Sequence, residues 1–167
     1  MRSAMPDTKT LYETDFLAWS KEQAEALRSV GRGGGSNQLL DWENLAEEID
    51  SLGVSQKAAL RSQLRRIIRH LLKLEFSPAA APRGGWFESI NDARSEIEDL
   101  LEISPTLKRE LGEALPMAYR QGSKAAISDL TAHGELDPAA LARVRVRTYT
   151  AEQILGDWFP PEPPRGE

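Results

Sequence analysis

The sequence predicts an all-α fold: a helical bundle of about four main helices built around a long central helix, with short extra helical turns near the C-terminus. Two observations carry this prediction. Apolar residues recur at helical spacing over residues 41–76, and apolar–polar alternation is confined to residues 143–149, for which the sequence offers no partner strand. No catalytic motif, nucleotide-binding loop or metal-ligand cluster stands out, so the pattern indicates a fold class before any activity.

Residues 41–76 carry the signals of one long helix. Asp41 is expected to cap it by accepting a hydrogen bond from the backbone amide of Asn44. Its first turns are acidic and its last turns basic, which is the order that the helix dipole favours. Gly53 lies between two apolar runs, and an interior Gly costs about 1 kcal/mol relative to Ala, so a straight helix, a kink or a turn remains open there. The runs are Leu45, Ile49, Leu52 and then Leu60, Leu64, Ile67, Leu71, Leu74.

A shorter helix is predicted before it, from about Thr14 to Val30, with Thr14 as the N-cap. The Gly-rich stretch 31–37 predicts a flexible connector between the two helices. A phosphate-binding loop is the competing interpretation, but the Lys and the Ser or Thr that such a loop needs after its last Gly are not in place. The expected apolar face of the first helix comprises Phe16, Trp19, Gln23, Leu27 and Val30.

Residues 77–85 hold two prolines and two glycines and predict a loop. A strongly acidic helix is expected to follow, from Trp86 or Phe87 to about Ile103. Because a short loop favours antiparallel neighbours, this helix is expected to return along the basic half of the long helix. Residues 57–103 are therefore predicted to form a charge-complementary hairpin, in which each exposed pair contributes roughly 0.2–1 kcal/mol.

The next helix is predicted to start at Ser104, as N-cap, with Pro105 in its first position. It should end near residues 133–134. Pro116 lies in its interior, where proline removes a backbone hydrogen bond, so a kink or two shorter helices are expected.

Three further features complete the chain. Asp137 and Pro138 predict a short helix through Ala142, and residues 143–149 are expected to be extended or helical. Thr150 and Gln153 form a capping box that opens a last turn. The predicted organisation is a frayed N-terminus (1–10), a single helical domain (11–159) and a disordered Pro-rich tail (160–167).

Composition narrows the classes of function and compartment. The 167 residues carry a net charge of −5, which argues against nucleic acid or an anionic membrane as the main partner. The absence of cysteine excludes disulfide and thiolate chemistry. The N-terminus lacks the apolar core of a signal peptide, and no stretch approaches 18 uninterrupted apolar residues. We therefore expect a soluble, cytoplasmic protein.

Several blocks of the sequence are similar to one known family. They are YETDFLAWSKEQAEALR, DWENLAEEIDSLG, LRRIIRHLLKLEFSP, the WFESI helix and YTAEQILGDWFP. Together, from about Leu11 to Pro160, they resemble the bacterial family known as domain of unknown function number 29. The resemblance implies an all-helical domain and no activity, because none is established for the family. Two features depart from the family pattern: the connector 31–37 is longer and richer in Gly, and Leu74 stands where an aromatic residue is common.

Glu47, Glu48 and His70 are candidate metal ligands or acid–base groups, because helical bundles build carboxylate–His sites from facing helices. Glu48 and His70 are roughly 33 Å apart along an unbroken helix, so they meet only if the chain folds back between them or a second chain contributes. A second version pairs His70 with Asp92 or Glu96 across the hairpin. The competing interpretation is a His70 that flanks the core and bonds one carboxylate.

A basic stripe at a spacing of four residues is formed by Arg61, Arg65, Arg69 and Lys73. Such a stripe is a candidate surface for nucleic acid or phosphate. The acidic helix at 86–103 is a closer partner within the same chain, and the net charge is negative. We therefore expect the stripe to pair with that helix.

Aromatic residues gather near the predicted helix ends. They can line a pocket, but aromatic residues in such places more often seal the ends of a bundle, which is the role we expect. The set comprises Trp19, Trp42, Trp86, Phe87, Trp158 and Phe159.

The function is not given by the sequence. The leading hypothesis is a non-catalytic helical interaction domain that binds a protein partner or forms a homo-oligomer; no cofactor is predicted. The alternative is a metal-dependent helical-bundle enzyme that uses His70 with helix carboxylates. The third hypothesis is nucleic-acid or phosphate binding through the basic stripe.

Overall fold

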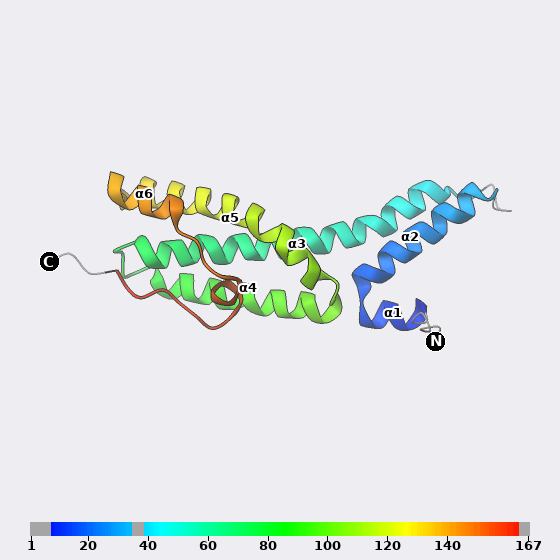
Figure 1. Ribbon diagram of the computed structural model, residues 1–167, viewed down its shortest axis with the longest axis horizontal. Helices are drawn as coiled ribbons and strands as arrows, with labels where there is room; N and C mark the ends of the chain where they lie inside the picture. The colour runs from blue at the N-terminus through cyan, green and yellow to red at the C-terminus, as the bar shows by residue number, and fades with distance from the viewer. Residues whose placement is uncertain (1–7, 35–38, 164–167) are drawn as a thin grey trace. The chain divides into compact units, whose positions relative to one another are not determined.

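The computed structural model describes residues 8–34 and 39–163, which form seven helices and no strand (Figure 1). The four long helices and the short C-terminal ones confirm the predicted all-α fold, and none of the described helices is long and apolar enough to cross a membrane. The helices are α1 (Thr8–Thr14), α2 (Phe16–Arg32), α3 (Trp42–Phe76), α4 (Arg83–Ile103), α5 (Leu107–Ala132), α6 (Pro138–Val146) and α7 (Ala151–Leu155).

The contacts within the chain divide it into two compact units. Unit 1 comprises Met1–Ala59 and Glu98–Leu111, and unit 2 comprises Leu60–Ile97 and Gly112–Glu167. The frayed N-terminus and the disordered tail stay predictions, since residues 1–7 and 164–167 lie outside the described chain. The single domain also stays a prediction. Within the predicted ranges, residues 8–10 belong to α1, and residues 160–163 are without helix.

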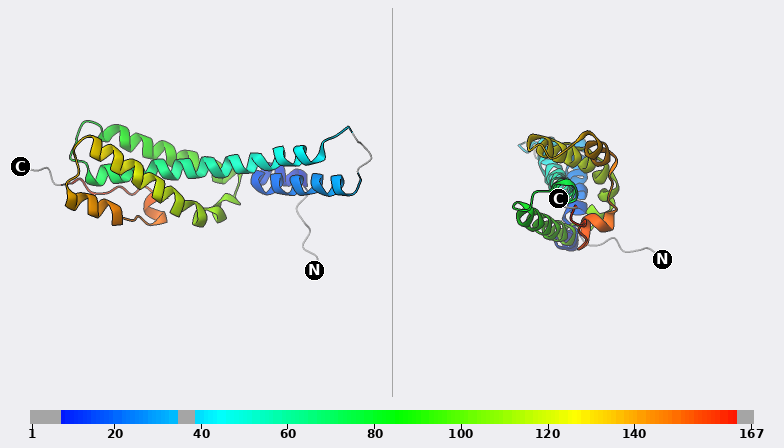
Figure 2. Two further views of the ribbon diagram at one scale, coloured as in Figure 1. Left: turned by 90° about the horizontal axis from the view of Figure 1, so that it is seen from above. Right: turned by 90° about the vertical axis from the view of Figure 1, so that its left-hand side faces the viewer.

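Helix α3 is the long helix that the sequence predicts, and it passes through Gly53 without a break. The amide of Asn44 donates to Oδ1 of Asp41 at 3.2 Å, as expected for the cap. A Cβ atom on Gly53 would lie 2.7 Å from Cδ1 of Leu17 and 2.9 Å from Oγ of Ser20. The glycine therefore permits a close approach of α2 to the first part of α3, which run side by side (Figure 2).

The N-cap of α2 is Asp15 and not Thr14. The carboxylate of Asp15 accepts from the amide of Ala18 at 3.1 Å. Thr14 instead closes the separate helix α1, where its hydroxyl donates to the carbonyl of Thr10 at 2.8 Å. Of the Gly-rich connector that the sequence predicts after α2, residues 35–38 lie outside the described chain.

Two predicted helix starts are also corrected. Helix α4 begins at Arg83, ahead of Trp86, despite the two glycines that follow Arg83. The buried Arg83 donates to the carbonyl of Leu74 at 3.0 Å, so it is fixed against the end of α3. Helix α5 begins at Leu107 because the hydroxyl of Ser104 is bonded outside its own helix, as described below.

The remaining predictions for the C-terminal third are resolved as follows. Pro116 lies inside the single helix α5, which excludes two shorter helices. Gly134 has φ +67° just beyond α5, where the helix was expected to end. Helix α6 extends beyond Ala142 to Val146, and the capping box of Thr150 with Gln153 is formed.

In unit 2, α4 runs antiparallel to α3 and α5 runs parallel to it (Figure 1). Gln63 contacts Glu96, whereas Lys73, farther along α3, lies over the ring of Trp86 at 4.6 Å, so residue numbers rise in opposite directions. Against α5 they rise together, from Arg61 with Met117 to Arg69 with Asp129. The buried core of this unit includes Leu60, Leu64, Ile67, Ile68, Leu71, Leu72, Leu74, Ile90, Ile97 and Leu130.

We predict that Gly53→Ala destabilises the protein by about 1–3 kcal/mol, because the added methyl overlaps buried atoms of α2. The matched control is Gly112→Ala in α5, where no atom lies within 4 Å of the added methyl. That change should stabilise the protein by about 0.5–1 kcal/mol. Denaturant titration of both variants measures the difference, and equal shifts would contradict the close approach at Gly53.

Candidate functional site

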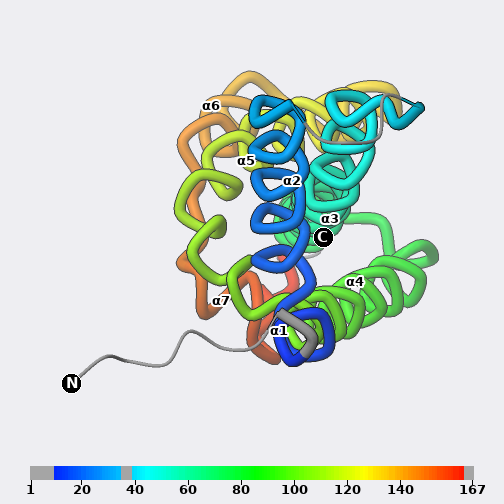
Figure 3. Tube along the Cα trace, turned by 90° about the vertical axis from the view of Figure 1, so that its right-hand side faces the viewer, coloured from blue at the N-terminus to red at the C-terminus, as the bar shows by residue number. Residues whose placement is uncertain are grey.

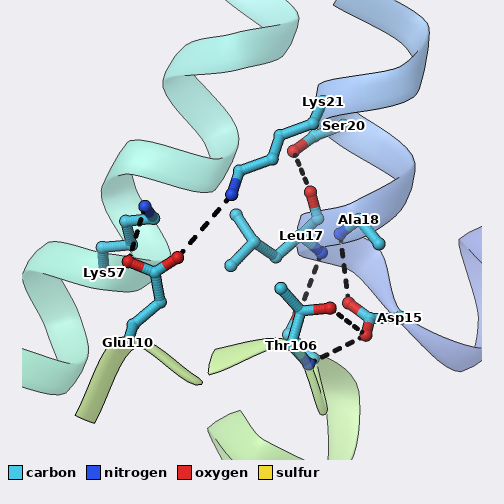
Figure 4. A network of polar contacts seen from close by, with 9 residues as sticks. Asp15, Leu17, Ala18, Ser20, Lys21, Lys57, Thr106 and Glu110 are labelled. Carbon is cyan, nitrogen blue, oxygen red and sulfur yellow. Dashed lines mark hydrogen bonds and ion pairs between the residues drawn. The ribbon is translucent and has the colours of Figure 1, made fainter. Parts of the chain in front are cut away.

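A polar network in unit 1 ties the segment before α5 to the start of α2 (Figure 4). Besides capping α2, Asp15 accepts from the amide of Thr106 at 2.8 Å and from its hydroxyl at 2.7 Å. The buried hydroxyl of Ser104 accepts from the amide of Leu17 at 3.1 Å and donates to Oε1 of Gln56 at 2.6 Å. These groups satisfy one another, so the network positions helices and offers no free nucleophile.

Glu110 extends this network to α3. Its carboxylate accepts from Nζ of Lys57 at 2.7 Å and lies 3.7 Å from Nζ of Lys21 (Figure 4). The hydrogen bond from Lys57 holds the pKa of Glu110 below its usual value. The start of α5 is thereby fixed to both α2 and α3.

Small side chains together with Leu17, and not the predicted large ones, form the contact between α2 and α3. Ser20 and Ala24 of α2 and Ala46 of α3 are fully buried, and Gly53 is buried beside them. The larger residues that were expected to face the core are displaced to the side. Leu45 and Leu52 are each 41% exposed, and Val30 is 45% exposed.

The displaced residues lie on one common edge of the α2–α3 pair. In α2, Val30 precedes Gly31, which lies against Trp42; in α3, Leu52 precedes Gly53, which lies against α2. The exposed residue is thus one position before a contact residue in both helices. Because the two helices are antiparallel, side chains that come one position before the contact residues point to the same edge of the pair in both helices. We call this set the apolar face; it comprises Leu27, Val30, Leu45, Ile49 and Leu52.

Along the opposite edge of the pair, ion pairs connect α2 with α3. Arg28 approaches Asp50 at 3.1 Å and Glu43 at 3.7 Å. Arg28 follows Ala24 by four residues and Asp50 follows Ala46 by four, which is the opposite offset from the apolar face. The α2–α3 pair therefore has one polar, ion-paired edge and one apolar edge that is half open.

An aromatic cluster lies where α1 meets α2. The rings of Tyr12, Phe16 and Trp19 lie within 4.8–5.8 Å of one another, centroid to centroid, and Tyr12 is 53% exposed. Phe16 and Trp19 belong to the stripe of α2 that the sequence predicted as apolar. The cluster thus continues that stripe toward the start of α2.

The border of the apolar face is acidic. Asp41 and Glu48 lie one helical turn before Leu45 and Leu52, and both carboxylates are exposed. The basic residues of α2 and of the first part of α3 already form ion pairs: Lys21, Arg28, Arg32 and Lys57. The uncompensated charge beside the apolar face is therefore negative.

The structure places the predicted metal-ligand candidates as follows. Glu47 and Glu48 are exposed residues of unit 1, whereas His70 belongs to unit 2. Glu96 bonds Gln63, and Asp92 is exposed. No cluster of three or more His, Asp or Glu side chains suited to a metal ion occurs in the described part of the chain.

His70 lies among cations. Burial first, and then the charges of Lys73 and Arg69, lower the pKa of His70 to about 4. The carboxylate that acts on it is Asp129 of α5, not Asp92 or Glu96. Its Nδ1 is buried without a hydrogen-bond partner. His70 is thus neutral at pH 7 and surrounded by positive charge, which opposes the binding of a cation.

The basic stripe does not pair with α4 as predicted. Arg69 forms two hydrogen bonds with Asp129 of α5, at 2.8 and 2.9 Å, and Lys73 approaches the same carboxylate at 3.2 Å. Of the acidic side chains on α4, Glu96 lies 3.7 Å from Arg66. Residues four apart follow one side of α3, and that side faces α5.

Asp129 is the hub of these contacts. Burial would raise its pKa, but the hydrogen bonds from Arg69 and Lys73 outweigh burial, and the pKa lies below its usual value. No local sequence pattern predicts this pairing, because Asp129 lies far along the chain from Arg69 and Lys73. The charge pattern therefore identified the stripe but not its partner.

Sequence reasoning missed the role of Arg94. Its buried guanidinium donates to the carbonyls of Ile154, Gln153 and Trp158 at 3.0, 2.9 and 2.8 Å, and it lies over the ring of Phe159 at 4.8 Å. The available signal was a charged residue on the apolar face of its helix. Arg94 fixes the C-terminal segment to α4, and Trp158 and Phe159 pack there as parts of that anchor.

A second cluster, which is partly buried, surrounds Glu75. It accepts from the hydroxyl of Tyr149 at 2.7 Å and from Nε of Arg147 at 2.8 Å, and Tyr119 accepts from the amide of Tyr149. Burial raises the pKa of Tyr119 to about 12. Both tyrosines remain protonated at neutral pH, so the cluster holds the chain after α6 in place.

Comparison with known proteins agrees with this fold. The sequence matches the family Domain of unknown function DUF29 over residues 11–159, and the chain belongs to that family. An alpha-helical protein of unknown function from Rhodospirillum rubrum, known from a crystal structure, has the same fold. The TM-score is 0.71 at 22% identity, over 87% of this chain and 89% of the other. None of the curated proteins matches the sequence.

We predict that His70 makes the protein sensitive to acid. Its pKa is lower in the folded state than in the unfolded chain, so unfolding takes up a proton and stability falls as the pH drops from about 6.5 toward 4. His70→Gln should remove that part of the pH dependence, measured as the denaturation midpoint between pH 7 and 4. His133→Gln changes an exposed histidine instead, and a wild-type pH profile in His70→Gln would contradict the prediction.

We also predict that Arg94→Met detaches the C-terminal segment, because three carbonyls lose their donor. The expected loss of stability is about 2–4 kcal/mol. Limited proteolysis should then cleave after α6 faster than in the wild type. Arg143→Met, at an exposed site of α6, should leave the cleavage rate unchanged, and equal rates in both variants would refute the anchoring role.

Proposed function

We propose that this protein is a non-catalytic interaction domain whose apolar face in unit 1 binds an amphipathic helix of a partner protein. The observation that carries the proposal is the pair of half-exposed apolar stripes on one edge of α2 and α3. A single exposed leucine is common on a protein surface, whereas a contiguous apolar strip with a charged border is typical of a docking site.

The shape of the apolar face favours a helical occupant. Leu45 and Leu52 are seven residues apart, which is roughly 10 Å along the helix axis. One row of apolar side chains comes from α2 and the other from α3. A third helix that presents apolar residues at positions i, i+3, i+4 and i+7 can pack against two such rows.

The charge of the border favours a basic partner. Asp41 and Glu48 stand beside the apolar residues, and the cations of α2 and the first part of α3 are all ion-paired. A helix flanked by Lys or Arg would meet complementary charge. A second copy of this chain would bring the same acidic border against its own, so self-association is the less favoured form of the hypothesis.

The rival functions have weaker support. A metal-dependent enzyme built on His70 would have to hold a cation beside Lys73 and Arg69.

The cytoplasmic location expected from the sequence stays a prediction, which cell fractionation tests.

The proposal predicts that a synthetic Leu/Lys helical peptide with apolar residues in a heptad pattern binds the protein. Leu52→Ser should weaken binding at least tenfold, because it removes apolar area from the face without changing charge. Isothermal titration calorimetry measures both affinities. A Leu/Glu peptide of the same pattern should not bind.

The matched control is Val54→Ser. Val54 is 60% exposed but lies two residues past Leu52, on another side of α3. Equal affinity losses in both variants would refute the apolar face as the site. Concentration-dependent dimerisation in sedimentation experiments, lost in Leu52→Ser, would replace the partner helix by a second copy of the chain.

A further inference from the structure

A second candidate site lies in unit 2 and is independent of the apolar face. A groove of about 520 Å³ runs between α3 and α5. Each helix contributes four residues with the same spacing: Ser62, Arg65, Arg66 and Arg69 from α3, and Gln121, Lys124, Ala125 and Ser128 from α5. Because the helices are parallel, these two sets face each other along two turns.

The groove has a defined geometry because the two helices are held close together. A Cβ on Gly122 would lie 3.0 Å from the carbonyl of Arg65 and 3.1 Å from the side chain of Ile68. At the end of the groove, the two hydrogen bonds from Arg69 to Asp129 fix the orientation of that guanidinium. The cations are therefore presented from a packed helix pair rather than from a loop.

All the charged side chains that line the groove are positive. Four of the eight lining residues are Arg or Lys, none is acidic, and Ser62, Ser128 and Gln121 add neutral donors. Within the described residues, Arg65 and Lys124 have no ion pair, and Arg66 has a loose one with Glu96 at 3.7 Å. The carboxylate of Asp129 is shared by Arg69 and Lys73, so it does not neutralise the groove.

This arrangement carries an energetic cost to the isolated protein. Like charges four residues apart on a helix repel each other and destabilise it. Arg61, Arg65 and Arg69 form two such pairs in sequence, and Lys124 faces them from α5. A bound anion would offset this repulsion.

We propose that the α3–α5 groove binds a small molecule that carries two or more phosphate groups. Guanidinium groups and hydroxyl donors match phosphate oxygens, which only accept hydrogen bonds. The residues of α3 that line the groove extend over roughly 10 Å along the helix, from Ser62 to Arg69, which is longer than one phosphate. The volume of the groove falls within the range of about 300–1,000 Å³ that is usual for small-molecule sites.

Calorimetric titration with inorganic tripolyphosphate tests the proposal. The full chain should bind it with an affinity that falls as salt is added. Arg65→Gln and Lys124→Gln should each weaken binding at least tenfold, and the double variant should abolish it. Both variants should unfold at the same or a slightly higher temperature without ligand, since each relieves repulsion; a purely structural role would lower that temperature.

Lys108→Gln is the matched control, because Lys108 is an exposed cation that does not line the groove. Equal weakening in the control would show a general charge effect and overturn the proposal, as would no binding of tripolyphosphate or of a nucleoside triphosphate at millimolar concentration. A labelled single-stranded oligonucleotide is titrated in parallel. Tighter binding of the oligonucleotide, lost in the same variants, would replace the small ligand by a nucleic acid.

Discussion

The structure depends on how the circumference of α3 is divided among its neighbours. In unit 1 the side that carries Ala46 and Gly53 is occupied by α2. In unit 2 one side meets α4 through Gln63, and another meets α5 through Arg61 and Arg69. A helix side used for one contact is closed to others. Leu45 and Leu52 lie one position before Ala46 and Gly53, beside the side that α2 covers, and they remain half exposed (Figure 3 shows α2 and α3 from another direction).

Local signals predicted the helices well and their partners less well. The caps at Asp41 and Thr150 need only the next three residues, so the sequence contained them in full. Ser104 has the same local signature but bonds Leu17 and Gln56. A hydroxyl with two possible partners is decided by tertiary packing, which a local pattern does not encode.

The same limit applies to the faces of the helices. Hydrophobic spacing selected Leu45 and Leu52 as core, because large apolar residues have the most to gain from burial. The contact is instead made where Gly53 meets Leu17 and Ser20 of α2, because a residue without a side chain lets the other helix approach closely. Charge spacing likewise selected the basic stripe and the acidic helix as partners. Asp129 is nearer to Arg69 and Lys73, and it outweighs several more distant carboxylates.

Residues that hold the fold together differ from those of the candidate sites in whether their polar, charged or apolar groups find a partner inside the protein. At Asp15, Glu110 and Arg94, charged groups meet hydrogen-bond partners inside the protein, so these residues account for the fold. The apolar face and the α3–α5 groove are different, since each leaves a physical interaction incomplete: apolar area still in water, or cations without counter-charge. Either feature costs stability in isolation, and replacing the exposed Arg65 with a neutral residue would change the stability of the fold little. Residues that the fold does not need, placed together on a fixed scaffold, are where a binding function is best sought.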